Sequence, residues 1–138
     1  MVIKYIVIFS ATLFTLVATI FIVLVIISPG KPKALTDNKG NYLKSSISEK
    51  VYVQIGGIRQ GMFIRSKNIE NPVLLFVHGG PCFSEYFLVE KYPTGLEDHF
   101  TVCYWEQRGC GISYTQELSL ENINLEQLSN DLVDVTNY

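Results

Sequence analysis

Cysteine is scarce in this sequence, which contains only Cys82, Cys103 and Cys110. Three cysteines cannot all pair with one another, and their spacing matches neither a disulfide framework nor the ligand pattern of a metal site. The scarcity excludes a small secreted domain held by disulfides, and we expect free thiols in a reducing compartment. No motif for a metal ion or another cofactor is present, so we expect none.

Charge is absent from the stretch between Tyr5 and Ile27. As a helix this stretch would be about 34 Å long, enough to cross a hydrocarbon core of roughly 30 Å. A buried core helix is usually shorter and has a polar face. A cleavable signal peptide has a shorter apolar region and a small-residue cleavage site, whereas "SPGKPK" follows here. We therefore predict a transmembrane anchor over residues 1–27 that contacts membrane lipid through residues 5–27.

Charged residues are distributed unevenly over the rest of the chain. Lys4 and the amino terminus precede the apolar stretch, and Lys31, Lys33, Lys39 and Lys44 follow it. Because cytoplasmic flanks are enriched in lysine and arginine, this count predicts a cytoplasmic globular part. Residues 84–138 carry ten acidic side chains against Lys91 and Arg108. Such a segment would repel phosphate, so we expect no nucleic-acid partner for it.

Residues 28–50 contain many prolines, glycines, serines and lysines and few apolar residues, which predicts a linker or juxtamembrane stalk. From residue 51 the pattern changes to alternating polar and apolar residues on either side of Gly56-Gly57. This pattern predicts a β-hairpin with strands over 51–55 and 58–65. The run "VLLFV" at 73–77 has no polar alternate, which predicts a strand buried on both faces of a sheet.

The second half of the chain alternates between helical and strand patterns. Residues 84–98 are partly helical, and a second buried strand starts at Phe100. Asn124 and Gln127 form a capping-box pattern at the start of a final helix. The apolar positions of that helix, expected to share one face, are Leu125, Leu128, Leu132 and Val135. The order of elements predicts an α/β fold over residues 51–138, namely the opening part of an α/β sheet.

The first buried strand ends in His78-Gly79-Gly80-Pro81. Ligands of α/β sheets bind just beyond the carboxyl ends of the strands. Two glycines let backbone N–H groups approach a ligand without an intervening Cβ, and a proline fixes the bend that follows. Amide donors presented in this way suit an oxyanion hole, which stabilises the negative oxygen formed when a carbonyl is attacked.

Two motifs in this order carry a family resemblance. "HGGPC" at 78–82, followed by "YWEQRGCGIS" at 104–113, resembles the proline iminopeptidase group of the α/β-hydrolase fold, whose pattern is HGGPG and then D-Q-R-G-x-G-x-S. The similarity covers about residues 51–138. It implies a serine peptidase or hydrolase that acts on a small peptide, amide or ester. It also implies that Gly80 donates an oxyanion-hole N–H, that His78, Gly79, Pro81 and Cys82 shape the loop, and that the Gly80–Pro81 bond is cis.

The sequence departs from that family pattern at two positions. Cys82 replaces the last glycine of the first motif, where a Cβ disfavours a positive φ angle. Glu106 replaces the aspartate of the second motif. The remaining motif positions match, and they are Gln107, Arg108, Gly109, Gly111 and Ser113. We predict that Arg108 braces neighbouring groups through its planar fork of donors.

Several residues could be mistaken for catalytic groups. His78 is not expected to be the base, because the base of this family comes late in the chain, and His99 is expected at the surface. Cys82 lacks an identifiable base, so we do not expect it to be a nucleophile. Ser84 and Ser113 lie outside a G-x-S-x-G frame, and that frame is absent from the 138 residues.

These observations predict the oxyanion half of an active site without nucleophile, acid or base. The leading hypothesis is an amino-terminal fragment of a membrane-anchored hydrolase, inactive by itself. Its nucleophile would then lie roughly 12–22 residues beyond Tyr138, after a helix end, a short loop and a strand. The alternative is a noncatalytic membrane protein that keeps half a hydrolase domain as an interaction module.

Overall fold

The computed structural model describes residues 2–27, 30–80 and 82–138, and the chain divides after Lys31 into two compact units. The first unit is a helix, α1 (Val2–Ile27), with no buried residue. Thr12, Thr15 and Thr19 each donate a hydroxyl hydrogen bond of 2.8 Å to a backbone carbonyl one turn earlier. These hydroxyl groups of α1 are therefore satisfied within the helix, which is long and apolar enough to cross a membrane.

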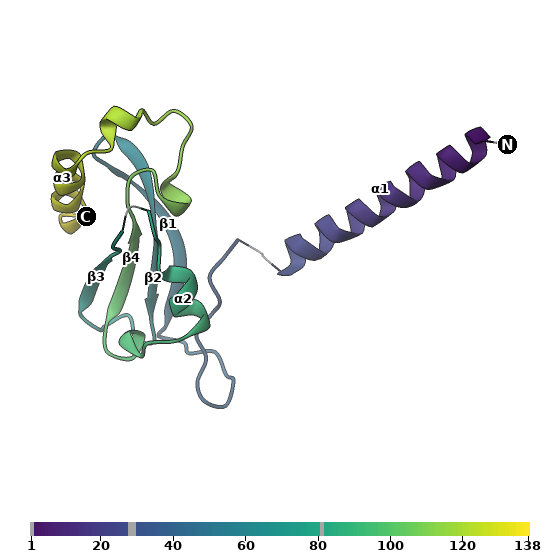
Figure 1. Cartoon of the computed structure of the whole chain (residues 1–138). Helices are drawn as coiled ribbons and strands as arrows, with labels where there is room; N and C mark the ends of the chain where they lie inside the picture. Colours follow the sequence, from purple (N-terminus) through teal and green to yellow (C-terminus); the bar gives the residue numbers. More distant parts are fainter. Residues whose placement is uncertain (1, 28–29, 81) are drawn as a thin grey trace. The chain divides into compact units, whose positions relative to one another are not determined.

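The second unit is built on a four-stranded sheet (Figure 1). Its strands are β1 (Ile47–Ile55), β2 (Ile58–Ser66), β3 (Val73–Val77) and β4 (Thr101–Glu106), in the order β1-β2-β4-β3. β2 is antiparallel to β1 and to β4, while β3 and β4 are parallel. Gly56 and Gly57 form the predicted hairpin turn with φ angles of +56° and +80°, which side chains rarely adopt. The α/β class is confirmed, and β1 starts at Ile47 rather than at residue 51.

Helices pack on both faces of the sheet, and β4 is buried between them. Val102 and Tyr104 of β4 pack against the short helix α2 (Tyr86–Lys91). Trp105 faces the other way and packs in a cluster with Val135 of α3 (Leu125–Thr136). This alternation is the period of two of a strand, so the prediction of a second buried strand is confirmed. Three short 3₁₀ turns complete the unit, η1 (Leu96–Asp98), η2 (Gly111–Ser113) and η3 (Leu120–Asn122).

The prediction that strand 73–77 is buried on both faces is wrong for the described residues. β3 lies at an edge of the sheet, with Val73 73% exposed and Val77 46% exposed. Its three central residues are half-buried. The physical reason is that β3 pairs with β4 along one side, and no described strand pairs with its other side.

α3 begins as predicted but presents a different face. The Asn124 side chain accepts a hydrogen bond of 2.9 Å from the Gln127 backbone N–H, whereas the Gln127 side chain bonds forward to Asp131 and does not close the capping box. Asp131 and Val135 are buried, while Leu125 is 83% exposed. The face of α3 that packs against the sheet is the one that carries Asp131 and Val135, so the expected leucine face is only partly covered.

Candidate active site

His78 joins the two sequence motifs at one end of the sheet. It follows β3 directly, and β4 ends beside it because Val77 and Trp105 are register partners. The His78 ring is buried, and its Nε2 accepts the backbone N–H of Gln107 at 3.2 Å. In return the Gln107 side-chain amide donates to the His78 carbonyl oxygen at 2.7 Å. The structure therefore brings His78 and Gln107 together as a brace between the two loops.

Gly79 and Gly80 lie beyond this brace, and both are exposed. Gly80 has a φ angle of +41°, and a Cβ added at either glycine would meet no described atom within 4 Å. The Gly80 carbonyl accepts the Phe83 backbone N–H at 3.0 Å, which closes a tight turn. The backbone at this strand end is thus open on the side where a ligand could approach. Pro81, and with it the predicted cis bond, lies outside the described residues.

Cys82 keeps the backbone conformation of the glycine it replaces, with a φ angle of +64°. Its sulfur is bonded to that of Cys110, and the two Cα atoms are 4.7 Å apart. The expectation of free thiols is therefore wrong for these two cysteines, because the fold brings together two loops whose proximity the spacing of the cysteines does not reveal. A disulfide sulfur is no nucleophile in this state, in keeping with the expectation for Cys82.

Cys103 is the free cysteine of the described residues. Burial raises the pKa of its thiol, so the reactive thiolate is disfavoured. It packs against the apolar cluster that contains Trp105 and Val135, as a small hydrophobic residue does.

Glu106, the first residue of the second motif, is 3% exposed at the end of β4. The Ser84 hydroxyl donates a hydrogen bond to Glu106 Oε1, whereas Oε2 has no hydrogen-bond partner in the described part of the chain. Gly111, with a φ angle of +45°, leaves the space that this carboxylate occupies, since a Cβ there would overlap Oε2. Glu106 and Ser84 thus form a second link between the two motif loops.

Ser113, the last motif residue, is 2% exposed and has a structural position. Its hydroxyl donates to the Glu106 carbonyl oxygen at 2.5 Å and accepts the Gly61 backbone N–H at 2.7 Å. It therefore fastens the turn that follows β4 to β2. Gly109 also belongs to this turn, with a φ angle of +75°. His99, expected at the surface, is exposed.

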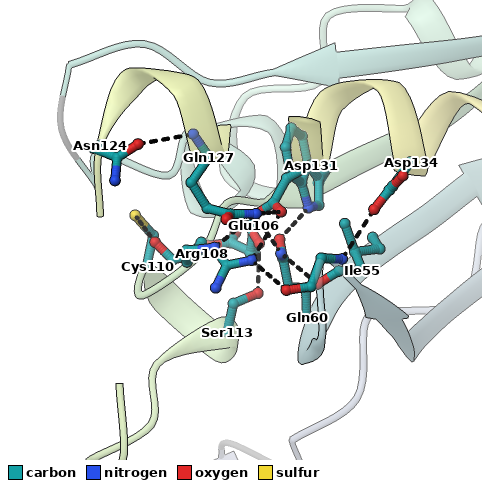
Figure 2. Close-up of polar contacts among 12 residues, drawn as sticks. Ile55, Gln60, Glu106, Arg108, Cys110, Ser113, Asn124, Gln127, Asp131 and Asp134 are labelled. Carbon is teal, nitrogen blue, oxygen red and sulfur yellow. Dashed lines mark hydrogen bonds and ion pairs between the residues drawn. The ribbon is translucent and has the colours of Figure 1, made fainter. Parts of the chain in front are cut away.

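Arg108 forms the brace predicted for it, and its partners are shown in Figure 2. Its Nε and Nη2 donate to the two carboxylate oxygens of Asp131, both at 2.8 Å. Nη2 also donates to the Gly56 carbonyl oxygen at 2.7 Å. Both charged side chains are almost fully buried. The guanidinium is therefore enclosed within the protein, and ties the second motif to α3 and to the hairpin turn.

Asp131 and Gln60 complete this network and were not identified from the sequence. The Gln60 amide donates to Asp131 at 2.7 Å and its oxygen accepts from the Trp105 indole N–H at 2.9 Å. Burial would raise the pKa of Asp131, but hydrogen bonds from Arg108, Gln127 and Gln60 outweigh it and hold this pKa below its ordinary value. One sequence signal was available: an aspartate four residues before Val135 on a helix face that packs inward.

A groove of about 660 Å³ lies elsewhere on this unit, between the hairpin and the segment after η2. Tyr52, Arg59, Tyr114 and Glu117 are among its lining residues, and the described residues of the 78–84 loop do not line it. The Arg59 guanidinium lies 3.8 Å from the centroid of the Tyr52 ring, a cation–π contact. This groove is separate from the loop on which the sequence motifs converge.

Comparisons with known proteins find relatives over part of the chain. No model of a known protein family matches the chain. The chain is 36% identical over 95 residues to the probable aminopeptidase YbaC of Bacillus subtilis (strain 168), a match that covers 69% of this chain and 30% of that protein. The chain thus spans about a third of the length of this curated relative.

Two solved structures share the fold of this chain over part of its length. A proline iminopeptidase-related protein of Thermus thermophilus is 28% identical with a TM-score of 0.55, over 66% of this chain and 32% of that one. Epoxide hydrolase A of Mycobacterium thermoresistibile is 22% identical with a TM-score of 0.52, over 66% of this chain and 28% of that one. The second likeness shows the fold alone.

Proposed function

Because the chain is related over this partial region to the proline iminopeptidase-like α/β-hydrolases, we propose that it supplies the oxyanion-hole half of a membrane-anchored serine hydrolase. The observation that carries the proposal is the open glycine backbone at the end of β3. Gly79 and Gly80 are exposed, unobstructed and held in place by the His78–Gln107 brace. An oxyanion hole requires such fixed amide donors.

In the proposed reaction a serine attacks the substrate carbonyl and its oxygen becomes negatively charged. The Gly80 N–H donates a hydrogen bond to that oxygen and lowers the energy of the transition state. His78 stays in its buried brace, and Arg108 stays in its ion pair, so neither touches the substrate. The nucleophile, base and acid come from residues of the full protein outside these 138, since no G-x-S-x-G frame is present here.

The exposed edge of β3 supports the same proposal. Both edges of β4 are paired, so on this side the sheet can be extended only by a strand that pairs with β3. A strand parallel to β3 would deliver a turn at its carboxyl end beside Gly79 and Gly80. A nucleophile on that turn would lie next to the proposed amide donor.

The substrate class proposed is a small peptide, amide or ester. One relative is a probable aminopeptidase and one structural neighbour is described as proline iminopeptidase-related. Amides and esters pass through the same kind of tetrahedral intermediate, so one oxyanion hole serves both. Release of an amino-terminal residue is the first activity to test.

α1 is the proposed anchor, and membrane lipid is its partner. The lysine count after the span predicts a cytoplasmic globular unit, and the Cys82–Cys110 disulfide favours an oxidising compartment instead. The two predictions are opposed, and labelling of intact cells with an impermeant reagent separates them.

The test uses the full-length protein in detergent with prolyl and alanyl p-nitroanilides and a p-nitrophenyl ester. We expect turnover of at least one of them and covalent labelling of a serine by a fluorophosphonate. The Gly80→Ala variant should lose about 10-fold or more of kcat, because its methyl group would occupy the open space through which the oxyanion is proposed to approach. The 138-residue chain by itself should give no turnover.

Gly57→Ala is the matched control. Gly57 also has a positive φ angle of +80° and open space around it, so the backbone strain is alike while the substrate is untouched. Equal kcat values for the two variants would contradict the role of Gly80. A full-length protein with neither turnover nor serine labelling would favour the noncatalytic interaction module.

A further inference from the structure

The loop after β3, which is proposed to hold the oxyanion, is linked at three points to the segment at the end of β4 and the turn that follows it. At its start His78 and Gln107 exchange hydrogen bonds, and at its end Ser84 bonds to Glu106. Between them Cys82 is covalently bonded to Cys110. The two outer links are noncovalent and independent of redox state. The middle link alone depends on the oxidation of two thiols.

The middle link also holds the residue with the least favourable backbone. Cys82 has a φ angle of +64°, and it is the one residue other than glycine with a positive φ in the described chain. A Cβ makes this conformation costly, so a free Cys82 would tend to leave it. The disulfide opposes that movement by fixing Cys82 to Cys110, which is buried at 4% exposure. Gly80, the proposed oxyanion donor, lies two positions earlier.

We propose that the Cys82–Cys110 disulfide is a positioning device that holds the oxyanion loop in its active conformation, so that turnover depends on the redox state of this pair. The inference rests on the proposed hydrolase function. Cys82 and Cys110 are positioning residues, since they act through the Gly80 backbone and do not touch the substrate.

The redox step is an ordinary thiol–disulfide exchange with a dithiol reductant. A thiolate of the reductant attacks the sulfur of the exposed Cys82, the Cys82–Cys110 bond breaks, and the Cys110 sulfur leaves as a thiolate that takes up a proton. The second thiol of the reductant, as a thiolate, then attacks the mixed disulfide and releases Cys82. Two electrons pass to the protein, and the reductant becomes a disulfide.

Two variants at Cys82 separate the effect of the backbone conformation from the effect of the disulfide bond itself. In Cys82→Gly the disulfide is lost, but glycine adopts the same φ angle without strain. In Cys82→Ser the disulfide is also lost and the strain stays. If the bond serves to hold the backbone, Cys82→Gly should behave like the oxidised protein and Cys82→Ser like the reduced one.

The first readout is hydrogen exchange in the 138-residue chain in detergent, with dithiothreitol as the reductant. Reduction should speed exchange of the backbone amides in the 79–83 loop of the wild type and have no effect on them in Cys82→Gly. Cys103→Ser controls for the free thiol, because Cys103 lies on β4 away from this loop. Unchanged exchange after reduction, with both thiols alkylated and identified by mass spectrometry, would overturn the proposal.

The second readout is kcat and KM of the full-length protein. Reduction and Cys82→Ser should each lower kcat by about 10-fold, less than the roughly 10²–10³ of a lost donor, with KM changed by less than about 2-fold. Cys82→Gly should retain more activity than Cys82→Ser and be insensitive to reductant. Equal activity of the two variants would overturn the proposal. If the protein has no turnover, the proposed function fails, and the exchange measurement still decides whether the bond orders the loop.

Discussion

Gly56 is the residue at which the hairpin turn and the buried ion pair meet. Its carbonyl oxygen accepts from Arg108, its N–H donates to Asp134 at 3.2 Å, and a Cβ on it would overlap Asp131 Oδ1. Its neighbour Gly57 has an equally unusual φ angle but faces open space. The two glycines of one turn therefore have different reasons to be glycine.

The first prediction compares alanine at these two positions. Gly57→Ala should lower the free energy of unfolding by about 1–2 kcal/mol, because a side chain is unfavourable in the left-handed region. Gly56→Ala should cost about 1–3 kcal/mol more, because the methyl group also displaces the Asp131–Arg108 pair. Urea unfolding of the full chain in detergent measures both. Equal losses of unfolding free energy in the two variants would show that the Asp131–Arg108 pair rearranges around the new methyl group without an energetic cost.

The second prediction concerns the stability of Cys82→Gly. Under reducing conditions glycine should stabilise the protein by about 0.5–1 kcal/mol or more, because it relieves the strain of a positive φ. Under oxidising conditions the variant should be less stable than the wild type, since a disulfide between residues 28 apart contributes on the order of 3 kcal/mol. Melting temperatures measured with and without dithiothreitol check the change of sign. The same sign in both conditions would contradict it.

At the scale of the elements, α3 is fixed to the sheet by a polar contact as much as by an apolar one. Asp131 is fully buried and bonds to Arg108, Gln60 and Gln127, while Val135 is its apolar neighbour one turn on. A buried ion pair is sensitive to removal of one partner, because the other charge is then left without compensation. The rotation of α3 about its axis is thereby set.

The third prediction follows from the lowered pKa of Asp131. A depressed folded-state pKa contributes stability above the unfolded value of about 4, and this contribution is lost as the pH falls through the folded value. Asp131→Asn should therefore cost about 3–5 kcal/mol near pH 7, and the gap to the wild type should narrow below about pH 4.

Asp134→Asn is the control for this experiment. Asp134 lies on the same helix and is exposed, and its one described side-chain hydrogen bond is to the Gly56 N–H. Its replacement should change stability by less than about 1 kcal/mol at any pH. Urea unfolding at several pH values measures both variants. A constant difference between Asp131→Asn and wild type from about pH 7 to about pH 3 would contradict the assignment.

The elements were largely predictable, and the reasons for the failures are physical. The hairpin about Gly56-Gly57, the strands at 73–77 and from Phe100, and the N-cap at Asn124 are local patterns, and all were found. The exposure of β3 depends on which strand lies beside it, which a local pattern does not contain. The pairing of Cys82 with Cys110 and the burial of Asp131 likewise depend on contacts between distant segments.

For the candidate site, the sequence identified the loop and the second motif, and Arg108 is an internal brace as predicted. The oxyanion role of Gly80 is still a prediction. Gln60 could not have been found, because a glutamine in a strand gives no sign of whether it faces solvent or a buried carboxylate. In this structure it faces Asp131.

At the scale of the whole molecule, α1 and the sheet unit make separate demands on their surroundings. The exposed side chains of α1 are almost all apolar, whereas the second unit has its own buried clusters and a charged surface. Exposure of the apolar side chains of α1 to water is unfavourable. Transfer of the charged surface of the second unit into hydrocarbon is unfavourable as well. We therefore predict that α1 spans a membrane and that the sheet unit lies in water.

The fourth prediction tests this division. The 138-residue chain should stay in the membrane pellet after carbonate extraction, because α1 is long and apolar enough to cross a bilayer. A chain that starts at Pro32, where the second compact unit begins, should be recovered in the soluble fraction. Recovery of the intact chain in the supernatant would contradict the anchor.

The fifth prediction addresses the side of the membrane. A persistent Cys82–Cys110 disulfide requires an oxidising compartment, so we expect the second unit outside the cytoplasm despite the lysine count. Asn38 is exposed, and Asn38→Cys in a Cys103→Ser background should react with a membrane-impermeant maleimide in intact cells. Labelling that occurs only after permeabilisation would place the unit in the cytoplasm.

The Arg108–Asp131 pair also has a consequence for synthesis on the ribosome. The two residues are 23 positions apart, and chains are elongated at about 5–20 residues per second. Arg108 therefore emerges about 1–5 s before its counter-charge. During that interval the hairpin and β4 can pair, but a guanidinium buried beneath them would lack its partner. We expect the nascent sheet to stay loosely packed, and open to chaperones, until α3 has left the exit tunnel.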